Sequence, residues 1–335
     1  MNDSSINAIA KKANVNPSVV SRVLRHCSGV DSETRLRILA EAGDVHNSFN
    51  GHCPVYAIIP DVPRSFWGRI RRGVADTLQS EGIPFKANIC TKVEDEAVAL
   101  QYIDEAERMD AQAIILAVSA TPAILQRLDK FTEDRLVLFL SEYCGMKNAF
   151  YCGSNAFQDG YKMGKYFMEN WADRTLILME VKGNLNSDSR IEGFLKAVSE
   201  MDESLAKKAV RIVVERKHLA NYKLTSSKLA PLLVNAAGKH DRLAIYVPAG
   251  IPNISLAVSK ADLAGRTVLL CQDYSPARTN VSELISVNQS GLEQGRTAAK
   301  LASAFVKTGS LPSEKRSFVS STISIHKKPA AVPES

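Results

Sequence analysis

The hydrophobic and polar positions of this 335-residue chain follow two different patterns, and the change between them lies near residue 50. Before it, apolar residues recur at three- and four-residue steps over short stretches, as in small amphipathic helices. After it, continuous apolar runs such as 55–60 alternate with longer helical patterns, which is typical of buried parallel strands joined by helices. The pattern therefore predicts a small all-α domain followed by a larger α/β region whose parallel sheets are covered on both faces.

The alternation in the larger region forms two series, which predict two similar α/β lobes with a cleft between them. The first series has expected strands at 55–60, 85–90, 113–118 and 136–140, and expected helices at 66–81, 94–109 and 122–131. The second begins near residue 149, with expected helices at 156–171, 188–201, 225–237, 254–261 and 292–307. Its expected strands are 176–181, 210–214, 243–247, 268–271, 284–287 and a last one near 318–325.

Three short helices are predicted in the first fifty residues. The first has an apolar face between residues 6 and 13, and Asn16-Pro17 is typical of an N-cap followed by the first position of a second helix. A third is expected after Asp31, a suitable N-cap, and should end near Gly43. Two short helices joined by a three-residue turn and closed by a third form a helix-turn-helix unit; the alternative is a generic three-helix bundle.

The net charge of the whole chain says little about function, whereas the distribution of charge in the first thirty residues is informative. The net charge of +6, from 42 basic and 36 acidic residues, permits a polyanionic partner but does not argue for one. Between residues 4 and 30, however, there are four cations and no acidic residue. The face of the second helix away from its apolar residues carries Ser18, Ser21, Arg22 and Arg25. A helix of this kind can enter the major groove, where Arg22 is able to pair bidentately with a guanine edge.

The motif Ile6-x-x-Ile9-Ala10-x-x-Ala13-x-Val15, followed by Val20-Ser21-Arg22-Val23-Leu24, resembles the opening of the lactose-repressor (LacI) family of bacterial transcription regulators. The resemblance implies that Pro17, Ser18 and Arg22 read bases and that Ser5 and Ser21 contact phosphates. Pro17 has no donor to offer, so it can read a base only by apolar contact, and Arg25 adds phosphate affinity. The segment 43–53 is shorter than the family linker and has no Leu at its wedge position, which leaves a minor-groove hinge helix in question.

The same resemblance extends more loosely over the larger region and implies a periplasmic-binding-protein-like fold, with a small ligand between two lobes. It points to six effector-binding candidates: Arg64, Phe66, Trp67, Arg190, Asp273 and Gln289. An aromatic face can stack on a sugar ring, and a guanidinium fork suits a hydroxyl pair or a carboxylate. Arg64 and Arg190 together would suit a sugar acid or an opine-like compound. The structural alternatives are an aromatic packed into its own lobe, a surface ion pair for Arg190 and a helix cap for Asp273.

Signatures of catalysis and of metal binding are absent from the sequence. There is no H-E-x-x-H or G-x-S-x-G motif, and the segment 160–165 is one residue short of a phosphate loop, so its glycines are interpreted as helix packing. We therefore expect no enzyme activity, no cofactor and no metal. Six cysteines without C-x-x-C spacing indicate reduced, mostly buried thiols, and no apolar run approaches membrane-spanning length. A cytoplasmic protein without a membrane partner is expected.

These patterns combine into one domain plan and one expected function. The plan is a helix-turn-helix domain at 1–46, a shortened linker at 47–54, a two-lobed effector-binding and dimerisation domain at 55–325 and a tail at 326–335. The expected function is that of a ligand-responsive transcription regulator, a repressor that binds a near-palindromic double-stranded DNA operator as a homodimer. Its effector would be a sugar, a sugar acid or an opine-like molecule. A solute-binding module without DNA function is the alternative.

Overall fold

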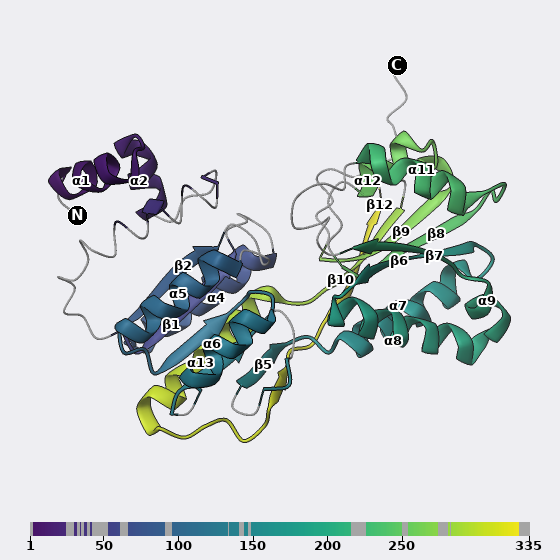
Figure 1. Ribbon diagram of the computed structural model, residues 1–335. Helices are drawn as coiled ribbons and strands as arrows, with labels where there is room; N and C mark the ends of the chain where they lie inside the picture. The colour runs from purple at the N-terminus through teal and green to yellow at the C-terminus, as the bar shows by residue number, and fades with distance from the viewer. Residues whose placement is uncertain are drawn as a thin grey trace, which may run out of the picture. The chain divides into compact units, whose positions relative to one another are not determined.

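The computed structural model describes residues 3–24, 30–31, 34, 37–38, 41, 53–60, 66–90, 96–132, 134–140, 144–146, 149–215, 226–249, 254–273, 281 and 283–327. The chain forms two compact units, Met1–Gly153 with Gly291–Val319, and Ser154–Ser290 with Ser320–Ser335. It therefore crosses between the units three times, after residues 153, 290 and 319. We call 53–153 with 291–319 the N-terminal lobe, 154–290 with 320–327 the C-terminal lobe, and the described residues between 3 and 41 the head (Figure 1).

The N-terminal lobe is built on a six-stranded sheet whose described pairs are all parallel. In the order β11-β5-β4-β3-β1-β2, its strands are Arg316–Phe318, Ala149–Gly153, Leu136–Phe139, Ala113–Leu116, Val55–Pro60 and Phe85–Cys90. Helices α4 (Phe66–Ser80) and α13 (Gly291–Thr308) pack on one face, and α5 (Glu96–Arg108) and α6 (Pro122–Phe131) pack on the other. Every residue of β1, β3, β4 and β5 is buried, as their continuous apolar runs predict.

The C-terminal lobe repeats this plan with one difference. Its strands, in the order β12-β10-β9-β8-β6-β7, are Thr322–Lys327, Glu283–Asn288, Thr267–Gln272, Leu243–Val247, Thr175–Lys182 and Val210–Glu215. Helices α7 (Ala156–Trp171) and α8 (Leu185–Met201) cover one face, and α11 (Ser226–Ala237) and α12 (Ile254–Lys260) cover the other. The short helices α9 (Glu203–Lys208) and η1 (Ala264–Arg266) complete it. Strand β12 is antiparallel to β10, so this sheet is not parallel throughout, contrary to the prediction.

Each lobe contains one pair of helices whose backbones touch at glycines. A Cβ atom added to Gly160 of α7 would lie 1.9 Å from the carbonyl oxygen of Arg190 in α8. In the N-terminal lobe, a Cβ on Gly295 of α13 would lie 2.1 Å from the carbonyl oxygen of Ile70 in α4. Both distances are far inside van der Waals contact, so only glycine fits. The helix-packing interpretation of the Gly160 segment is therefore confirmed.

The head contains α1 (Asp3–Ala13) and α2 (Pro17–Leu24), separated by a three-residue turn. Asn14 begins the turn at a φ of 53°, a left-handed conformation that Asn tolerates better than most residues. The Asn16 side chain accepts a hydrogen bond from the backbone N–H of Ser18 at 2.9 Å, which confirms it as the cap of α2. The buried residues of the head form one small core of their own: Ile9, Ala10, Ala13, Val20, Val23, Val30 and Ile38.

The predicted third helix lies only partly within the described residues. The Asp31 carboxylate accepts the backbone N–H of Thr34 at 2.9 Å, as an N-cap does, and this bond lowers the pKa of Asp31. Residues 34, 37, 38 and 41 are helical, and Ile38 is fully buried in the head core. Gly43, where this helix was predicted to end, and the linker to residue 52 lie outside the described residues.

Most predicted boundaries agree with the structure, and the larger exceptions lie near the places where the chain changes lobe. Helices α6 and α7 and strands β1, β2 and β8 begin and end as predicted. The single strand expected near 318–325 is wrong, because β11 and β12 are separate strands in different sheets. The second series was expected to begin near residue 149, yet β5 belongs to the first sheet. Strand β12 also reaches Lys327, inside the predicted tail, and α9 was not predicted.

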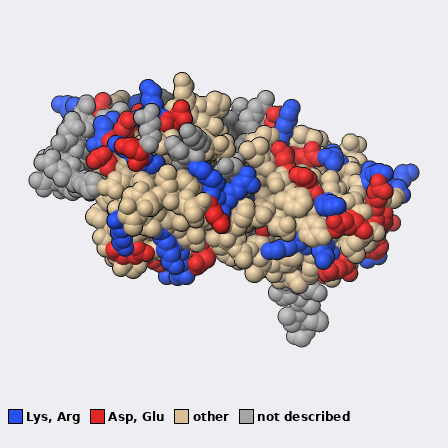
Figure 2. All heavy atoms as spheres, turned by 90° about the horizontal axis from the view of Figure 1, so that it is seen from below, with Lys and Arg blue, Asp and Glu red and all other residues tan. Residues whose placement is uncertain are grey.

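The distribution of charged side chains and the burial of the cysteines agree with what the composition predicts. On the face drawn in Figure 2, basic and acidic side chains are interspersed, so the modest net charge is not gathered into one large area there. Four of the cysteines, Cys53, Cys90, Cys152 and Cys271, are buried, as expected. Within the described residues, no helix combines the length and the apolarity that a membrane crossing requires.

Candidate functional site

The base-reading candidates lie together at the exposed side of α2. Pro17, Ser18 and Arg22 are exposed, whereas Val20 and Val23 of the same helix are buried in the head core. The Ser18 hydroxyl donates to the Asn16 side chain at 2.8 Å, so Ser18 serves the helix cap and can meet a base mainly through its oxygen. The helix therefore presents a short polar face that includes a guanidinium, as recognition in the major groove requires.

The other head candidates are described only in part. Ser21 is half-buried on α2. Ser5 lies in α1, but its side chain and the whole of Arg25 are outside the described residues. Lys11 is exposed, and Lys12 forms an ion pair of 3.6 Å with Glu41 of the third helix. The sequence window between residues 4 and 30 could not show this pair, because its acidic partner comes from beyond the window.

Three of the six effector candidates form one hydrogen-bonded cluster in the C-terminal lobe. Arg190 extends from α8, Asp273 follows β9, and Gln289 follows β10. The Nη2 of Arg190 donates to Oε1 of Gln289 at 2.8 Å. The backbone N–H of Gln289 donates to Oδ1 of Asp273 at 3.0 Å, and the Gln289 side-chain amide donates to Oδ2. The cluster therefore lies at the carboxyl ends of neighbouring strands, where open α/β sheets bind their ligands.

Arg190 is the most constrained member of this cluster. Its side chain is 6% exposed, and Nη1 donates to the carbonyl oxygen of Pro248 at 2.8 Å, just beyond the end of β8. Its Nε is buried and has no hydrogen-bond partner among the described residues. A buried guanidinium that keeps one unpartnered donor is suited to a ligand oxygen. The alternative of a surface ion pair for Arg190 is excluded by its burial.

The described contacts of Asp273 are with Val287 and Gln289; the residues that it would cap as the start of a helix, 274–280, lie outside the described residues. It adopts a φ of 44°, and its backbone N–H donates to Val287 at 2.9 Å. Its carboxylate is turned back towards Gln289 by the two bonds given above. Asp tolerates the left-handed region better than most residues, and Asp110 and Asp262 adopt it as well.

Sequence reasoning missed the polar residues that extend this cluster. Ser154, directly after β5, donates its hydroxyl to Oε1 of Gln289 at 2.8 Å and to Oδ2 of Asp159 at 2.5 Å. Asp159 is a buried carboxylate in the first turn of α7, and it also accepts the hydroxyl of Ser321. A polar residue directly after a buried strand, as at Ser154, was a signal available in the sequence. No such signal in the sequence indicated that Asp159 belongs to the cluster, because acidic residues are common in the first turn of a helix.

The aromatic candidates belong to the N-terminal lobe. Phe66 and Trp67 begin α4 and contact each other edge to face, with ring centroids 4.9 Å apart. Both are partly buried against the core of this lobe. A Cβ on Gly291 would lie 2.9 Å from the Phe66 ring, so that ring is held by α13 as well. Packing within their own lobe, the structural alternative, is therefore present for both rings; Arg64 lies outside the described residues.

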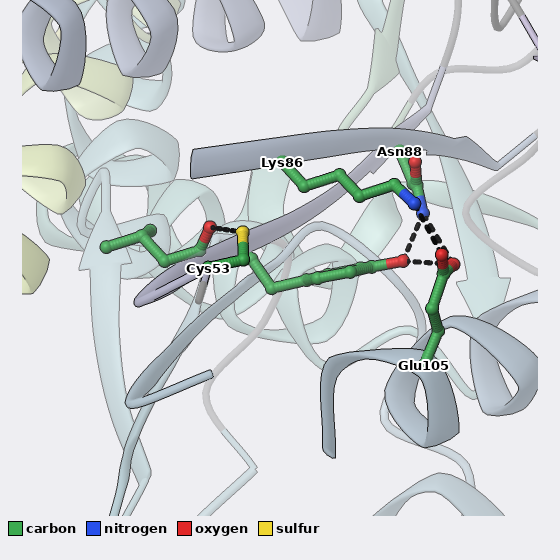
Figure 3. A network of polar contacts seen from close by, with 6 residues as sticks. Cys53, Lys86, Asn88 and Glu105 are labelled. Atoms are coloured by element: carbon green, nitrogen blue, oxygen red, sulfur yellow. Dashed lines mark hydrogen bonds and ion pairs between the residues drawn. The ribbon is translucent and has the colours of Figure 1, made fainter. Parts of the chain in front are cut away.

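A second polar network lies in the N-terminal lobe, between the edge strand β2 and α5 (Figure 3). Glu105 accepts the hydroxyl of Tyr56 at 2.6 Å, the amide of Asn88 at 3.1 Å and the ammonium of Lys86. Burial alone would raise the pKa of Glu105, but the charge of Lys86 and the hydrogen bonds from Lys86 and Tyr56 outweigh it and lower the pKa. Burial, followed by the charge of Glu105, raises the pKa of Tyr56 well above its usual value.

Comparison with known proteins gives two kinds of match: regulators that cover most of the chain, and solute-binding proteins that cover a smaller share of it. No protein-family model matches the chain. The HTH-type transcriptional regulator DegA of Bacillus subtilis is 20% identical over 311 residues, covering 87% of this chain and 89% of DegA. The solved structure of the transcriptional regulator CelR in complex with cellobiose is similar with a TM-score of 0.61 and 15% identity, over 95% of this chain and 98% of CelR.

Solute-binding proteins match a smaller share of the chain. GanP, a glucose-galactose binding protein from Geobacillus stearothermophilus, has a TM-score of 0.63 and 13% identity over 82% of this chain and 97% of its own. The periplasmic-binding-protein-like fold and the resemblance to helix-turn-helix regulators are thereby confirmed. The proteins compared are regulators or sugar-binding proteins.

Proposed function

We propose that this protein is a sugar-responsive, DNA-binding transcription regulator. The observation that carries the proposal is the joining, in one chain, of a capped helix-turn-helix head to a fold shared with sugar-binding proteins. The regulator CelR matches 95% of the chain, whereas GanP matches 82%. The difference has about the size of the head, which a solute-binding protein does not need.

In this proposal α2 reads the major groove, with Arg22 pairing to a guanine edge and Pro17 and Ser18 contacting neighbouring bases. Lys11, Ser21 and, outside the described residues, Arg25 contact phosphates, together with the Ser5 hydroxyl. A single short head contacts too few base pairs for a specific site, so two heads of a homodimer would bind the half-sites of a near-palindrome. The protein would act as a cytoplasmic repressor.

The effector site is assigned to the Arg190–Gln289–Asp273 cluster. Its carboxylate and amide oxygens accept hydroxyl protons, and its guanidinium donates to hydroxyl or carboxylate oxygens. This donor set fits a sugar or a sugar acid, with Arg64, Phe66 and Trp67 as further candidates. The effector can change DNA affinity only if it binds one conformation of the protein more tightly than the other.

The DNA-binding half is tested by two substitutions in the head. Arg22→Ala should weaken binding to the operator by about 1–3 kcal/mol and relax the sequence preference at one base pair. Lys11→Ala should weaken binding to all DNA alike and reduce the slope of the salt dependence by about one. Operator selection from random DNA, followed by titrations at several salt concentrations, measures both. An equal loss on operator and random DNA for Arg22→Ala would contradict base reading.

The effector half is tested by a thermal-shift screen with cellobiose, glucose, galactose, ribose, D-allose, D-arabinose and the corresponding sugar acids. A compound that binds the folded state stabilises it by about 2.7 kcal/mol at a hundredfold excess over its dissociation constant. Arg190→Lys should reduce that stabilisation, because an ammonium cannot replace a guanidinium fork. Stronger binding of neutral sugars than of all acids would exclude an anionic effector.

A solute-binding module without DNA function is the second candidate, and the likeness to GanP is the observation that favours it. Selection of a specific DNA sequence is the measurement that distinguishes the two candidates. A protein that binds a sugar in the screen but selects no DNA sequence would support the module. A protein that does both, with a sugar-dependent DNA affinity, supports the regulator.

A further inference from the structure

All three crossings of the chain between its two units enter one hydrogen-bonded network inside the C-terminal lobe. Ser154 follows the first crossing, and Ser321 lies just after the third. Their hydroxyls donate to the two oxygens of the same carboxylate, Oδ2 and Oδ1 of Asp159, which is 1% exposed. The Nζ of Lys162 donates to the Ser321 backbone carbonyl at 3.1 Å and to its hydroxyl oxygen at 3.2 Å. One buried carboxylate thus ties the first crossing to the third.

The second crossing is joined to the same network through the two residues before it, Gln289 and Ser290. The Ser290 hydroxyl donates to the carbonyl oxygen of Ser320 at 3.1 Å, which links it to the third crossing. Ser290 has a φ of 55°, and its backbone N–H donates to the Asn288 side chain at 3.0 Å. Gln289 accepts the Ser154 hydroxyl at 2.8 Å, which links it to the first crossing. A left-handed serine held by its neighbours indicates that the path of the chain here is imposed by the network.

The Ser154 hydroxyl lies between two acceptors, and it has only one proton to donate. Oδ2 of Asp159 lies 2.5 Å away on one side, and Oε1 of Gln289 lies 2.8 Å away on the other. The Gln289 amide cannot turn its nitrogen towards Ser154, because that nitrogen donates to the Asp273 carboxylate. The two acceptors therefore compete for this one proton.

Gln289 is also the member of the network that belongs to the effector cluster. Its Oε1 accepts a hydrogen bond from Nη2 of Arg190 at 2.8 Å, and the Nε of the same guanidinium has no partner among the described residues. A ligand hydroxyl that donates to this oxygen would satisfy it and leave the Ser154 proton wholly to Asp159. The atom at which a ligand would bind is thus one hydrogen bond away from the carboxylate that holds the crossings.

We propose that the Ser154 hydroxyl is a two-position hydrogen-bond switch, shared between Gln289 and Asp159, that couples occupancy of the effector cluster to the rigidity of all three crossings. In the empty protein the proton is divided between two acceptors. In the ligand-bound protein the Ser154 hydroxyl donates to Asp159 alone, and the backbone at all three crossings becomes more rigid. The identity of the occupant rests on the proposed function, whereas the coupling between the crossings does not.

The coupling is tested without any ligand, by hydrogen–deuterium exchange on the full-length protein. Ser154→Ala removes one of the two hydroxyls from Asp159, so amides around residues 154, 290 and 320 should all exchange about tenfold faster. Ser187→Ala is the matched control: Ser187 is a fully buried serine of the same lobe, and its hydroxyl accepts the backbone N–H of Val181, six residues before it. Acceleration restricted to the segment around residue 154, or equal acceleration in the control, would overturn the proposal.

The switch itself is tested with D-glucose and D-glucuronate as probes. A bound probe should slow exchange at the three crossings of the wild-type protein by about tenfold and leave it unchanged in Ser154→Ala. Equal slowing in both proteins would overturn the switch. Asp159→Asn is the second variant; it should loosen the crossings as Ser154→Ala does, and it keeps the side-chain size. Failure of the proposed function is a separate result, because it would appear as absence of sequence-specific DNA binding while the exchange pattern stayed as described.

Discussion

The two lobes are built alike and use their buried polar groups differently. Each has a six-stranded sheet, helices on both faces and one helix pair in contact at glycines. In the N-terminal lobe the polar network around Glu105 joins neighbouring strands to the helix packed on them. In the C-terminal lobe the network around Gln289 lies at the ends of strands and beside the chain crossings. The same architecture thus carries two different networks. The network in the N-terminal lobe joins elements of one core, and we call its residues Tyr56, Lys86, Asn88 and Glu105 the internal brace. The network in the C-terminal lobe is a candidate binding site.

The atoms left without a partner show what separates the two networks. Each contains one buried atom with no hydrogen-bond partner among the described residues, Asn88 Oδ1 in the N-terminal lobe and Arg190 Nε in the C-terminal lobe. The first is a neutral amide oxygen, whose loss of hydration costs little compared with that of an ion. The second belongs to a permanent cation. An unsatisfied donor on a buried cation is the more informative of the two, because it is the group that gains most from an added ligand.

The largest effect is expected from breaking the glycine contacts, which the lobes share. Gly160→Ala and Gly295→Ala each place a methyl group inside the backbone of the partner helix, and each should reduce the free energy of unfolding by at least about 3 kcal/mol. Only Gly160→Ala displaces the backbone of Arg190, so only this variant should also lose affinity for the effector. Urea unfolding and calorimetric titration measure the two effects.

Gly265→Ala serves as the control for this pair, since a Cβ there would meet no atom within 4 Å. It should leave both stability and affinity close to those of the wild-type protein. Equal loss of effector affinity in Gly160→Ala and Gly295→Ala would show that the site does not depend on the placement of Arg190, and the distinction between the lobes would fail.

A smaller effect is expected from Tyr56→Phe, which opens the internal brace. The hydroxyl of Tyr56 is buried against Glu105 and Asn88, and its removal leaves both with one fewer partner. The free energy of unfolding should fall by about 1–3 kcal/mol, while effector affinity stays unchanged. Urea unfolding monitored by tryptophan fluorescence measures the first quantity. Tyr161→Phe is the control, because that hydroxyl bonds Glu200 at the exposed surface; a change in effector affinity for Tyr56→Phe would contradict a purely structural brace.

The sequence predicted those features that depend on local pattern. The apolar run of β1 and the Asn16-Pro17 cap are local signals, and both elements begin where they were expected. The break between β11 and β12 is different. The stretch from Phe318 to Ile325 contains no glycine, proline or charged residue that would mark a boundary, so its sequence does not indicate that its two halves pair with strands of different sheets.

The candidate site shows the same limit. Asp273 and Gln289 follow buried strands, and because parallel strands end at one edge of a sheet, their meeting was predictable. The structure also brings Arg190 to them, although the binding role of all three stays a prediction. Asp159 could not be found in this way, since its partners Ser154 and Ser321 meet only where two crossings come together.

The smallest expected effect is the response of the Glu105 network to acid. The folded-state pKa of Glu105 is lowered: burial alone would raise it, but the charge and the hydrogen bond of Lys86 and the hydrogen bond of Tyr56 outweigh burial. A carboxyl with a lowered pKa stabilises the fold above its unfolded-state pKa of about 4.3, and this stabilisation is lost as the pH falls through the folded-state value. Glu105→Gln removes the titrating group, so its deficit in unfolding free energy should be constant near neutral pH and should shrink below about pH 4. Urea unfolding of both proteins across this range measures the deficit. A deficit that stays constant into the acid range would show that the brace does not depend on the charge of Glu105, and would remove the electrostatic part of the contrast between the lobes.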